Sequence, residues 1–252
     1  MPTAGVPSIL ITRPQPFAQE LAAAVRAEGW NPIILNVLAT RTAENPTQLG
    51  QRIRSLLPVS QAIFTSRSAV IHTFRILSPA DFDGSGIAAI GAGSARELEI
   101  HGIDSVLIPE EGSNSEALLQ LDQFSANNAG TAIVFCAPFG RNVLQRDLGE
   151  RGWQVHNAEI YQRVVQVAED STLSEIRTAK KLISVCTSGT AIKACKEQLP
   201  EDIWQQMLAQ TWLVISTRLE ALARVAGAKQ IYQSAGPSNN AITGAIRSVI
   251  NS

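Results

Sequence analysis

The chain has 252 residues, of which 45% are hydrophobic and 17% charged, and its formal net charge is −1. This length allows one large or two modest domains, and the composition excludes a disordered or collagen-like chain. The balanced charge argues against nonspecific nucleic-acid binding, which relies on a basic excess. No apolar run is long enough to span a membrane, and no signal peptide is visible. We therefore expect a cytoplasmic protein with neither nucleic acid nor membrane as a partner.

The cysteines and histidines form no metal-binding pattern. The three cysteines contain no CxxC pair, and an odd count suits a reducing compartment. The three histidines lie far apart in sequence and form no HExxH motif. We interpret these histidines as surface or packing residues and predict no metal site. The residues are Cys136, Cys186, Cys195, His72, His101 and His156.

Short apolar runs alternate with amphipathic stretches, which predicts an α/β fold with parallel sheets covered on both faces. The expected strands are Ile9–Ile11, Ile33–Leu35, Ala62–Phe64, Ile87–Ile90, Val106–Ile108, Ile133–Phe135, Val155–Val165, Leu182–Cys186, Trp212–Ile215 and Gln230–Tyr232. Helices are expected between most of them.

An internal repeat divides the chain into two similar α/β units of about 125 residues, with five expected strands each. Thr65–Val70 matches Thr187–Ile192, and Gly29-Trp30 matches Gly152-Trp153, each displaced by roughly 120 positions. A tandem division near Asn127 and a discontinuous division, in which the first strands join the last third of the chain, both satisfy this pattern.

The loops after the expected strands are rich in small and hydroxyl residues. Ligands of open α/β sheets collect there, and most of these loops begin a helix, whose free N–H groups attract anions. For any single loop, helix capping is the simpler interpretation. Eight such loops together favour a cleft for an anionic ligand. The predicted binding residues are Thr12, Arg13, Thr65, Ser66, Gly91, Ser94, Ser115, Thr187, Ser188, Gly189, Ser216 and Arg218.

Tyr161 is one of only two tyrosines and precedes an extended connector. A phenol there could face a gap between domains and donate a hydrogen bond to a leaving oxygen. An ordinary half-buried strand tyrosine is the alternative.

Taken in order, several segments resemble the uroporphyrinogen-III synthase family, and the likeness covers almost the whole chain. The matching segments are Ile9-Leu10-Ile11-Thr12-Arg13-Pro14, Phe64-Thr65-Ser66, Ser115-Glu116-Ala117-Leu118-Leu119, Gly149-x-x-Gly152, Tyr161-Gln162-Arg163, Thr187-Ser188-Gly189 and Val214-Ile215-Ser216-x-Arg218-Leu219.

The resemblance implies two flavodoxin-like domains joined by a two-stranded connector, with the active site in the cleft between them. It favours the discontinuous division: residues 1–38 with 167–252, an inserted domain at 41–163, and connectors at about 39–44 and 162–170.

The resemblance also implies a lyase of porphyrin and heme biosynthesis. Linear hydroxymethylbilane would lose water and close to uroporphyrinogen III, with ring D inverted through a spiro intermediate and no metal or organic cofactor. Tyr161 matches the family tyrosine thought to assist loss of the hydroxyl. The eight carboxylates of the substrate would suit the hydroxyl-rich loops. We expect a monomer that could receive its substrate from hydroxymethylbilane synthase.

Two features qualify this interpretation. Pro138 removes a backbone donor from the loop Cys136–Gly140, which weakens a binding role for that loop. A non-catalytic two-domain binder or sensor of a small anionic metabolite would have the same two-unit architecture.

Overall fold

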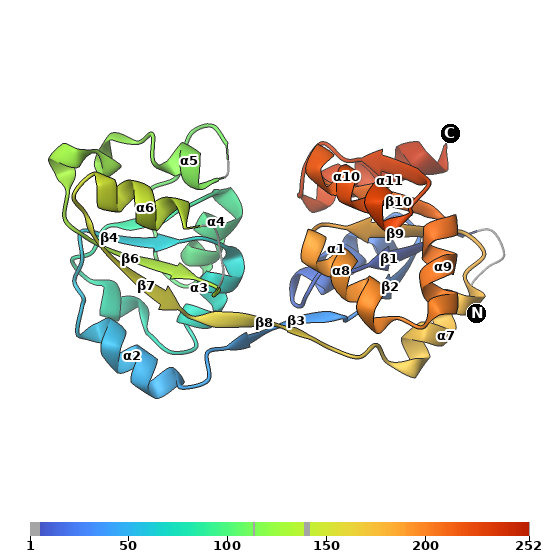
Figure 1. Ribbon diagram of the computed structural model, residues 1–252, viewed down its shortest axis with the longest axis horizontal. Coiled ribbons are helices and arrows are strands. Elements are labelled where there is room, and N and C mark those ends of the chain that lie inside the picture. Colours follow the sequence, from blue (N-terminus) through green and yellow to red (C-terminus); the bar gives the residue numbers. More distant parts are fainter. Residues whose placement is uncertain (1–5, 113, 139–141, 252) are drawn as a thin grey trace. The chain divides into compact units, whose positions relative to one another are not determined.

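The computed structural model describes residues 6–112, 114–138 and 142–251 (Figure 1). The chain forms two compact units. The first combines the residues up to Ala39 with those from Val164 onward, and the second spans Thr40–Arg163.

The first unit is built on a parallel sheet in the order β11-β10-β9-β1-β2. Its central strand pair joins distant parts of the chain, because Ser8 lies beside Leu182 and Ile11 beside Val185. All four residues of β1 are buried, as expected for a strand covered on both faces. The strands are β1 (Ser8–Ile11), β2 (Asn31–Ile34), β9 (Leu182–Cys186), β10 (Thr211–Val214) and β11 (Gln230–Gln233).

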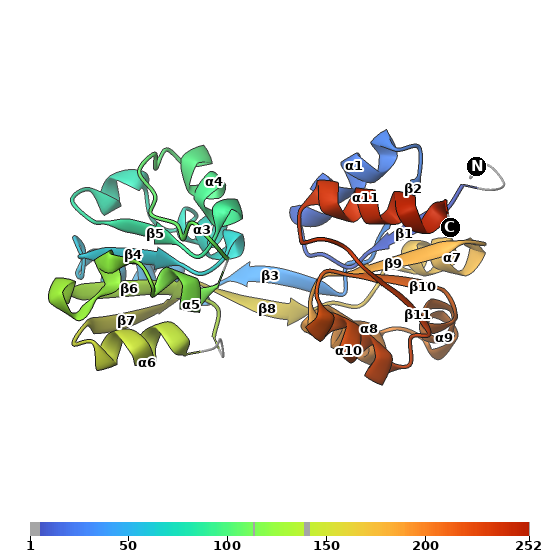
Figure 2. The same cartoon turned by 90° about the horizontal axis from the view of Figure 1, so that it is seen from above.

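Helices cover both faces of this sheet (Figure 2). On one face, Ile9 and Ile11 pack with α1 (Phe17–Ala27) and α11 (Asn239–Ile250). On the other, Leu10 and Trp212 pack with the remaining helices. Those helices are α7 (Asp170–Thr178), α8 (Gly189–Gln198), α9 (Glu201–Ala209) and α10 (Thr217–Ala226).

The second unit has a parallel sheet in the order β5-β4-β6-β7. The strands are β4 (Gln61–Phe64), β5 (Ile87–Ala89), β6 (Thr131–Cys136) and β7 (Gln154–Glu159). One face packs against α2 (Pro46–Arg54), α3 (Arg67–Thr73), α4 (Ala92–Ile100) and the 3₁₀ turn η1 (Pro79–Phe82). The other face packs against α5 (Ser115–Leu118), α6 (Val143–Glu150) and η2 (Asp122–Phe124), with η3 (Ala126–Asn128) beside them.

Two further strands, β3 (Leu38–Thr42) and β8 (Tyr161–Val165), form a small sheet of their own. The Ala43 N–H donates to the Ile160 carbonyl at 3.0 Å, and the Gln166 N–H donates to the Val37 carbonyl at 3.0 Å. These bonds close the two ends of an antiparallel ladder.

The expected strand Val155–Val165 is wrong as a single element, because its pairing partner changes at Ile160. The Ile160 N–H still bonds to Cys136 of β6, whereas its carbonyl already accepts from Ala43 beside β3. The chain therefore divides into β7 and β8. An apolar run alone carries no sign of this change of partner.

The expected strand Val106–Ile108 is reduced to one isolated bridge between Ala88 and Leu107. Pro109 follows at once and has no N–H to continue a ladder. The second unit thus has β4 to β7 and this bridge where five strands were expected.

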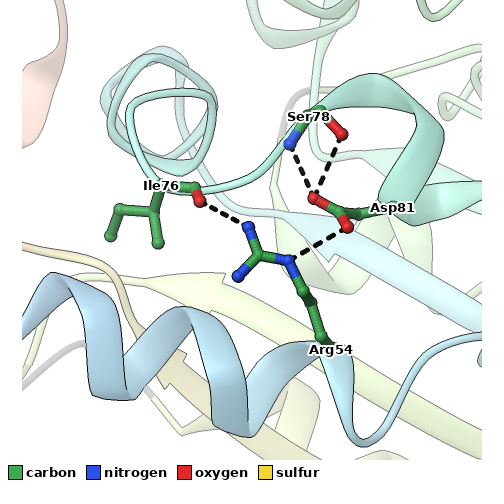
Figure 3. Close-up of polar contacts among 4 residues, drawn as sticks. All are labelled: Arg54, Ile76, Ser78 and Asp81. Atoms are coloured by element: carbon green, nitrogen blue, oxygen red, sulfur yellow. Dashed lines mark hydrogen bonds and ion pairs between the residues drawn. The ribbon is translucent and has the colours of Figure 1, made fainter.

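Arg54 and Asp81 connect α2 to η1 (Figure 3). Arg54 Nε donates to Asp81 Oδ1 at 3.0 Å, and Arg54 Nη2 donates to the Ile76 carbonyl at 2.9 Å. The other Asp81 oxygen accepts the Ser78 N–H at 2.7 Å and the Ser78 hydroxyl at 3.2 Å. The hydrogen bond from the Ser78 N–H, with a smaller effect from Arg54, holds the pKa of Asp81 below its ordinary value. Both carboxylate oxygens are therefore used.

We predict that Asp81→Asn lowers the free energy of unfolding by about 1 kcal/mol, because the new NH₂ group must face a donor. A carboxyl with a depressed folded-state pKa stabilises above its unfolded pKa, and this contribution disappears as pH falls through the folded pKa. The deficit should therefore be largest at neutral pH and vanish in acid. Urea titrations at several pH values measure it, with the exposed Asp83→Asn as control. Equal deficits at neutral and acid pH would contradict this account.

Candidate functional site

Predicted binding residues of the first unit lie at the carboxyl ends of its strands. Thr12 and Arg13 follow β1, Thr187 to Gly189 follow β9, and Ser216 follows β10 by two residues. These strands are parallel neighbours, so the segments that follow them all begin at the same end of the sheet, the end where the strands terminate.

Ser188 and Ser216 cap the helices that begin at this end of the sheet. Ser188 Oγ accepts the Ala191 N–H at 3.1 Å, and Ser216 Oγ accepts the Leu219 N–H at 3.4 Å. The cap uses a lone pair of the serine oxygen, so the hydroxyl hydrogen is still a donor. A Cβ at Gly189 would lie 2.9 Å from Leu222 Cδ1 of α10, so a larger residue there would displace the end of that leucine side chain.

Thr12 and Arg13 bond within the protein. Thr12 is 1% exposed, and its Oγ1 donates to the Val185 carbonyl at 3.0 Å. Arg13 Nη1 donates to Asn239 Oδ1 at 3.0 Å, and Nη2 donates to the Pro237 carbonyl. The Thr12 hydroxyl therefore links the end of β1 to β9. Arg13 holds the loop before α11 in place. Arg218 is exposed and makes no hydrogen bond or ion pair with the residues that the structure describes.

In the second unit, Thr65 and Ser66 follow β4, and Gly91 lies two residues after β5 as the N-cap of α4. Thr65 Oγ1 donates to the Phe135 carbonyl at 2.9 Å. Ser94, in the first turn of α4, is 7% exposed. Ser115 begins α5, which packs on the opposite face of the sheet from α3 and α4. The structure therefore does not group Ser115 with them.

Tyr161 also lies near the carboxyl end of β4, although the chain arrives there from β7, an edge strand of the sheet. It follows β7 and begins β8, and its hydroxyl lies 3.1 Å from Ser66 Oγ. The same Ser66 oxygen accepts the Ala69 N–H at 3.1 Å to cap α3. Tyr161 is 3% exposed and belongs to the core of its own unit. Ser66 Oγ therefore both contacts the Tyr161 hydroxyl and caps α3.

His72, interpreted from the sequence as a surface or packing residue, also lies at this site. Its ring stacks on Tyr161 with centroids 5.4 Å apart and planes 10° apart. Burial, with a smaller effect of Arg75, lowers the pKa of His72 to about 4. The ring is therefore neutral at neutral pH. The sequence pattern that could have indicated this contact is Thr40-x-Thr42, because residues two apart in a strand share a face. Both of these hydroxyls contact the His72 ring.

A hollow of about 740 Å³ lies in the second unit beside Tyr161. Its lining carries the carboxylates of Glu44 and Glu159 and the guanidinium of Arg52. That charge pattern suits a polyanion less well than the capped loops do, so we place the candidate site at the loops.

Burial disfavours the thiolate form of the cysteines. Burial raises the pKa of Cys136 to about 11, with a smaller contribution from Glu159, and raises that of Cys186 to about 12. Within the described ranges, no three His, Cys, Asp or Glu side chains gather to hold a metal ion. No helix there has both the length and the apolar character needed to cross a bilayer.

The sequence model of the family described as uroporphyrinogen-III synthase HemD matches residues 19–244. Uroporphyrinogen-III synthase of Salmonella typhimurium is 31% identical over 256 aligned residues, which cover 95% of this chain and all of the relative. That of Escherichia coli is 26% identical over 248 residues with the same coverage.

Two solved structures share the fold. Uroporphyrinogen-III synthetase of Helicobacter pylori aligns with a TM-score of 0.61 at 17% identity, covering 97% of this chain and 100% of that one. A mutant uroporphyrinogen III synthase of Thermus thermophilus aligns with a TM-score of 0.58 at 15% identity, covering 98% and 100%.

We predict that Arg13→Ala and Arg218→Ala differ in thermal stability. Arg13→Ala removes the hydrogen bonds to Pro237 in the loop before α11 and to Asn239 at the start of that helix, and it should cost about 1 kcal/mol, or 2–4 °C in Tm. Arg218→Ala should leave Tm nearly unchanged. Scanning calorimetry of both variants tests this, and equal shifts would show that the Arg13 contacts add no stability.

Proposed function

The chain belongs to the uroporphyrinogen-III synthase family, and we propose that Tyr161 is its catalytic proton donor. The enzyme closes linear hydroxymethylbilane to uroporphyrinogen III, with loss of water and inversion of ring D. This reaction belongs to heme biosynthesis.

The contact between Ser66 and Tyr161 carries this proposal. Ser66 Oγ accepts the Ala69 N–H, and a serine hydroxyl also has one hydrogen to donate. When that hydrogen points to the phenol oxygen, 3.1 Å away, the phenol hydrogen is free for another acceptor. In this arrangement the capping serine holds the phenol oxygen and leaves the phenol as the donor to that acceptor.

The acceptor in this proposal is the leaving hydroxyl of hydroxymethylbilane. Pyrrole electrons expel the hydroxyl as the C–O bond breaks, and the phenol proton converts it to water. The substituted end of ring D then attacks the exposed carbon, and a proton lost in the later steps can return to the phenolate. Ring D must be held close to that carbon, so much of the acceleration should come from folding the substrate.

The carboxylates of the substrate are assigned to the capped loops. Ser188 and Ser216 each offer a hydroxyl hydrogen, and Gly189 begins a helix whose first N–H groups have no partner inside it. Arg218 adds an exposed positive charge at the same end of the sheet. We propose Thr65, Gly91 and Ser94 as the equivalent set in the second unit, with Thr187 beside Ser188. For Thr12 and Arg13, the proposed role is to shape the loops.

Several expectations stay predictions: a cytoplasmic monomer, hand-over from hydroxymethylbilane synthase, and catalysis without metal or organic cofactor. Membership of the family replaces the alternative of a non-catalytic binder.

Tyr161→Phe should lower the initial rate of type III formation by up to about a hundredfold without abolishing it. General acid catalysis contributes about 10²–10⁴-fold, and the leaving group here already departs from a pyrrole-activated carbon. The rate is measured by isomer analysis of the product formed from hydroxymethylbilane.

Tyr232→Phe is the matched control, because Tyr232 is the second tyrosine of the chain and is 44% exposed on β11. It should keep the parent rate. A parent rate for Tyr161→Phe would remove Tyr161 from the mechanism, and a rate lost together with the melting transition would make its role structural.

Arg218→Ala should weaken binding of uroporphyrinogen III about threefold to tenfold, since one exposed charge-assisted contact among many is lost. Arg224→Ala is the control, because Arg224 lies in the last turn of the same helix and pairs with Glu220 at 2.7 Å. Anaerobic titration gives both affinities. Complete loss of binding in Arg218→Ala would indicate a single arginine clamp instead of many dispersed donors.

A further inference from the structure

His72 is a buried titratable residue that the proposed reaction does not use. It is 1% exposed, and both of its ring nitrogens have partners. Nδ1 lies 2.9 Å from Thr42 Oγ1, and Nε2 lies 2.9 Å from Thr40 Oγ1. No ring nitrogen is left to bind substrate.

The two threonines fix the plane of the imidazole. A neutral imidazole has one N–H donor and one acceptor nitrogen, whereas a threonine hydroxyl can either donate or accept. Both bonds can therefore form at once in either tautomer. The two bonds go to different residues, so rotation of the ring about its Cβ–Cγ bond would break at least one of them.

The face of this fixed ring covers Tyr161. The ring centroids lie 5.4 Å apart with planes 10° apart. Helix α3 thus contacts Tyr161 at both of its ends, with the N-cap Ser66 at the phenol hydroxyl and His72 in the last turn at the phenol ring. A short helix is stiff, so these two contacts set the position and the direction of the hydroxyl together.

The strand that holds His72 is also bonded next to Tyr161. Thr40 and Thr42 share one face of β3, and Ala43 donates to the carbonyl of Ile160, the residue before Tyr161. The backbone at the start of β8 and the ring that stacks on its first side chain are therefore held by the same segment.

We propose that His72 is a positioning residue for Tyr161, acting through the bonds of its ring to Thr40 and Thr42 and through its stack on the phenol. This inference rests on the proposed role of Tyr161 as proton donor. Its consequence is that His72 matters to the reaction only while the Tyr161 hydroxyl is present.

A double-mutant cycle tests that consequence. His72→Phe keeps an aromatic face but loses both nitrogens, and we expect kcat to fall about threefold to tenfold with KM changed less than about twofold, because a misdirected group costs rate and leaves binding intact. In the Tyr161→Phe background, the same change should have no further effect on kcat. The ratio of type III to spontaneous type I product keeps slow variants measurable.

Two further variants guard against misfolding and against general effects of replacing a stacked histidine. Thr42→Val preserves shape and removes one ring partner, so it should show a smaller loss of kcat with the same dependence on Tyr161. His101→Phe is the control for losing a stacked histidine, because the partly exposed His101 stacks on Phe74 with centroids 4.6 Å apart, in the same unit. It should keep the parent kcat.

The outcomes separate the inference from the function on which it rests. A parent kcat for Tyr161→Phe would overturn the proposed function and the inference with it. A slowed Tyr161→Phe, combined with an equal fold-loss from His72→Phe in both backgrounds, would overturn only the positioning role. An unchanged kcat in both His72→Phe and Thr42→Val would do the same.

Discussion

Parallel pairing of β4, β6 and β7 is the constraint on which the candidate site depends. Parallel strands have their carboxyl ends at the same end of a sheet, so the residues after β4 and after β7 are close in space. Ser66 and Tyr161 are in contact there although they are 95 positions apart in the chain. The N-terminus of α3 lies at this end of the sheet because a helix follows β4 directly. One serine hydroxyl can therefore cap the helix and contact the phenol.

The same constraint operates in both units, but the chain enters the two sheets at different strands. The order β5-β4-β6-β7 corresponds to β10-β9-β1-β2, with Ser66 and Ser188 as equivalent caps. Gly29-Trp30 precedes β2 as Gly152-Trp153 precedes β7, and both glycines have positive φ, at 79° and 86°. The repeat is thus circularly permuted. This explains why a repeat in sequence, which records similarity but not pairing, agrees with more than one division of the chain.

Local sequence predicts the features that depend on local physics. Apolar runs indicate most strands, and Thr-Ser pairs before helices indicate the caps, because both follow from backbone conformation and burial within a few residues. The role of His72 could not be predicted in this way, since it depends on β3 lying beside α3, about 30 residues away along the chain. The break at Ile160 and the burial of the Thr12 hydroxyl are likewise set by distant strands.

Helix capping and anion binding are not competing roles for the loop serines. The cap uses a lone pair of the serine oxygen, whereas a carboxylate would use its hydrogen and the first N–H groups of the helix. A protein of net charge −1 can in this way offer many donors to a polyanion without a basic surface. Arginines are then free for structural work, as in Arg13, which fastens a loop, and Arg67, which joins α3 to Glu97 of α4 at 2.8 Å. Apart from Arg218, the substrate-facing contacts are assigned to uncharged donors, and in our proposal a phenol, held by a serine and a histidine, supplies the proton.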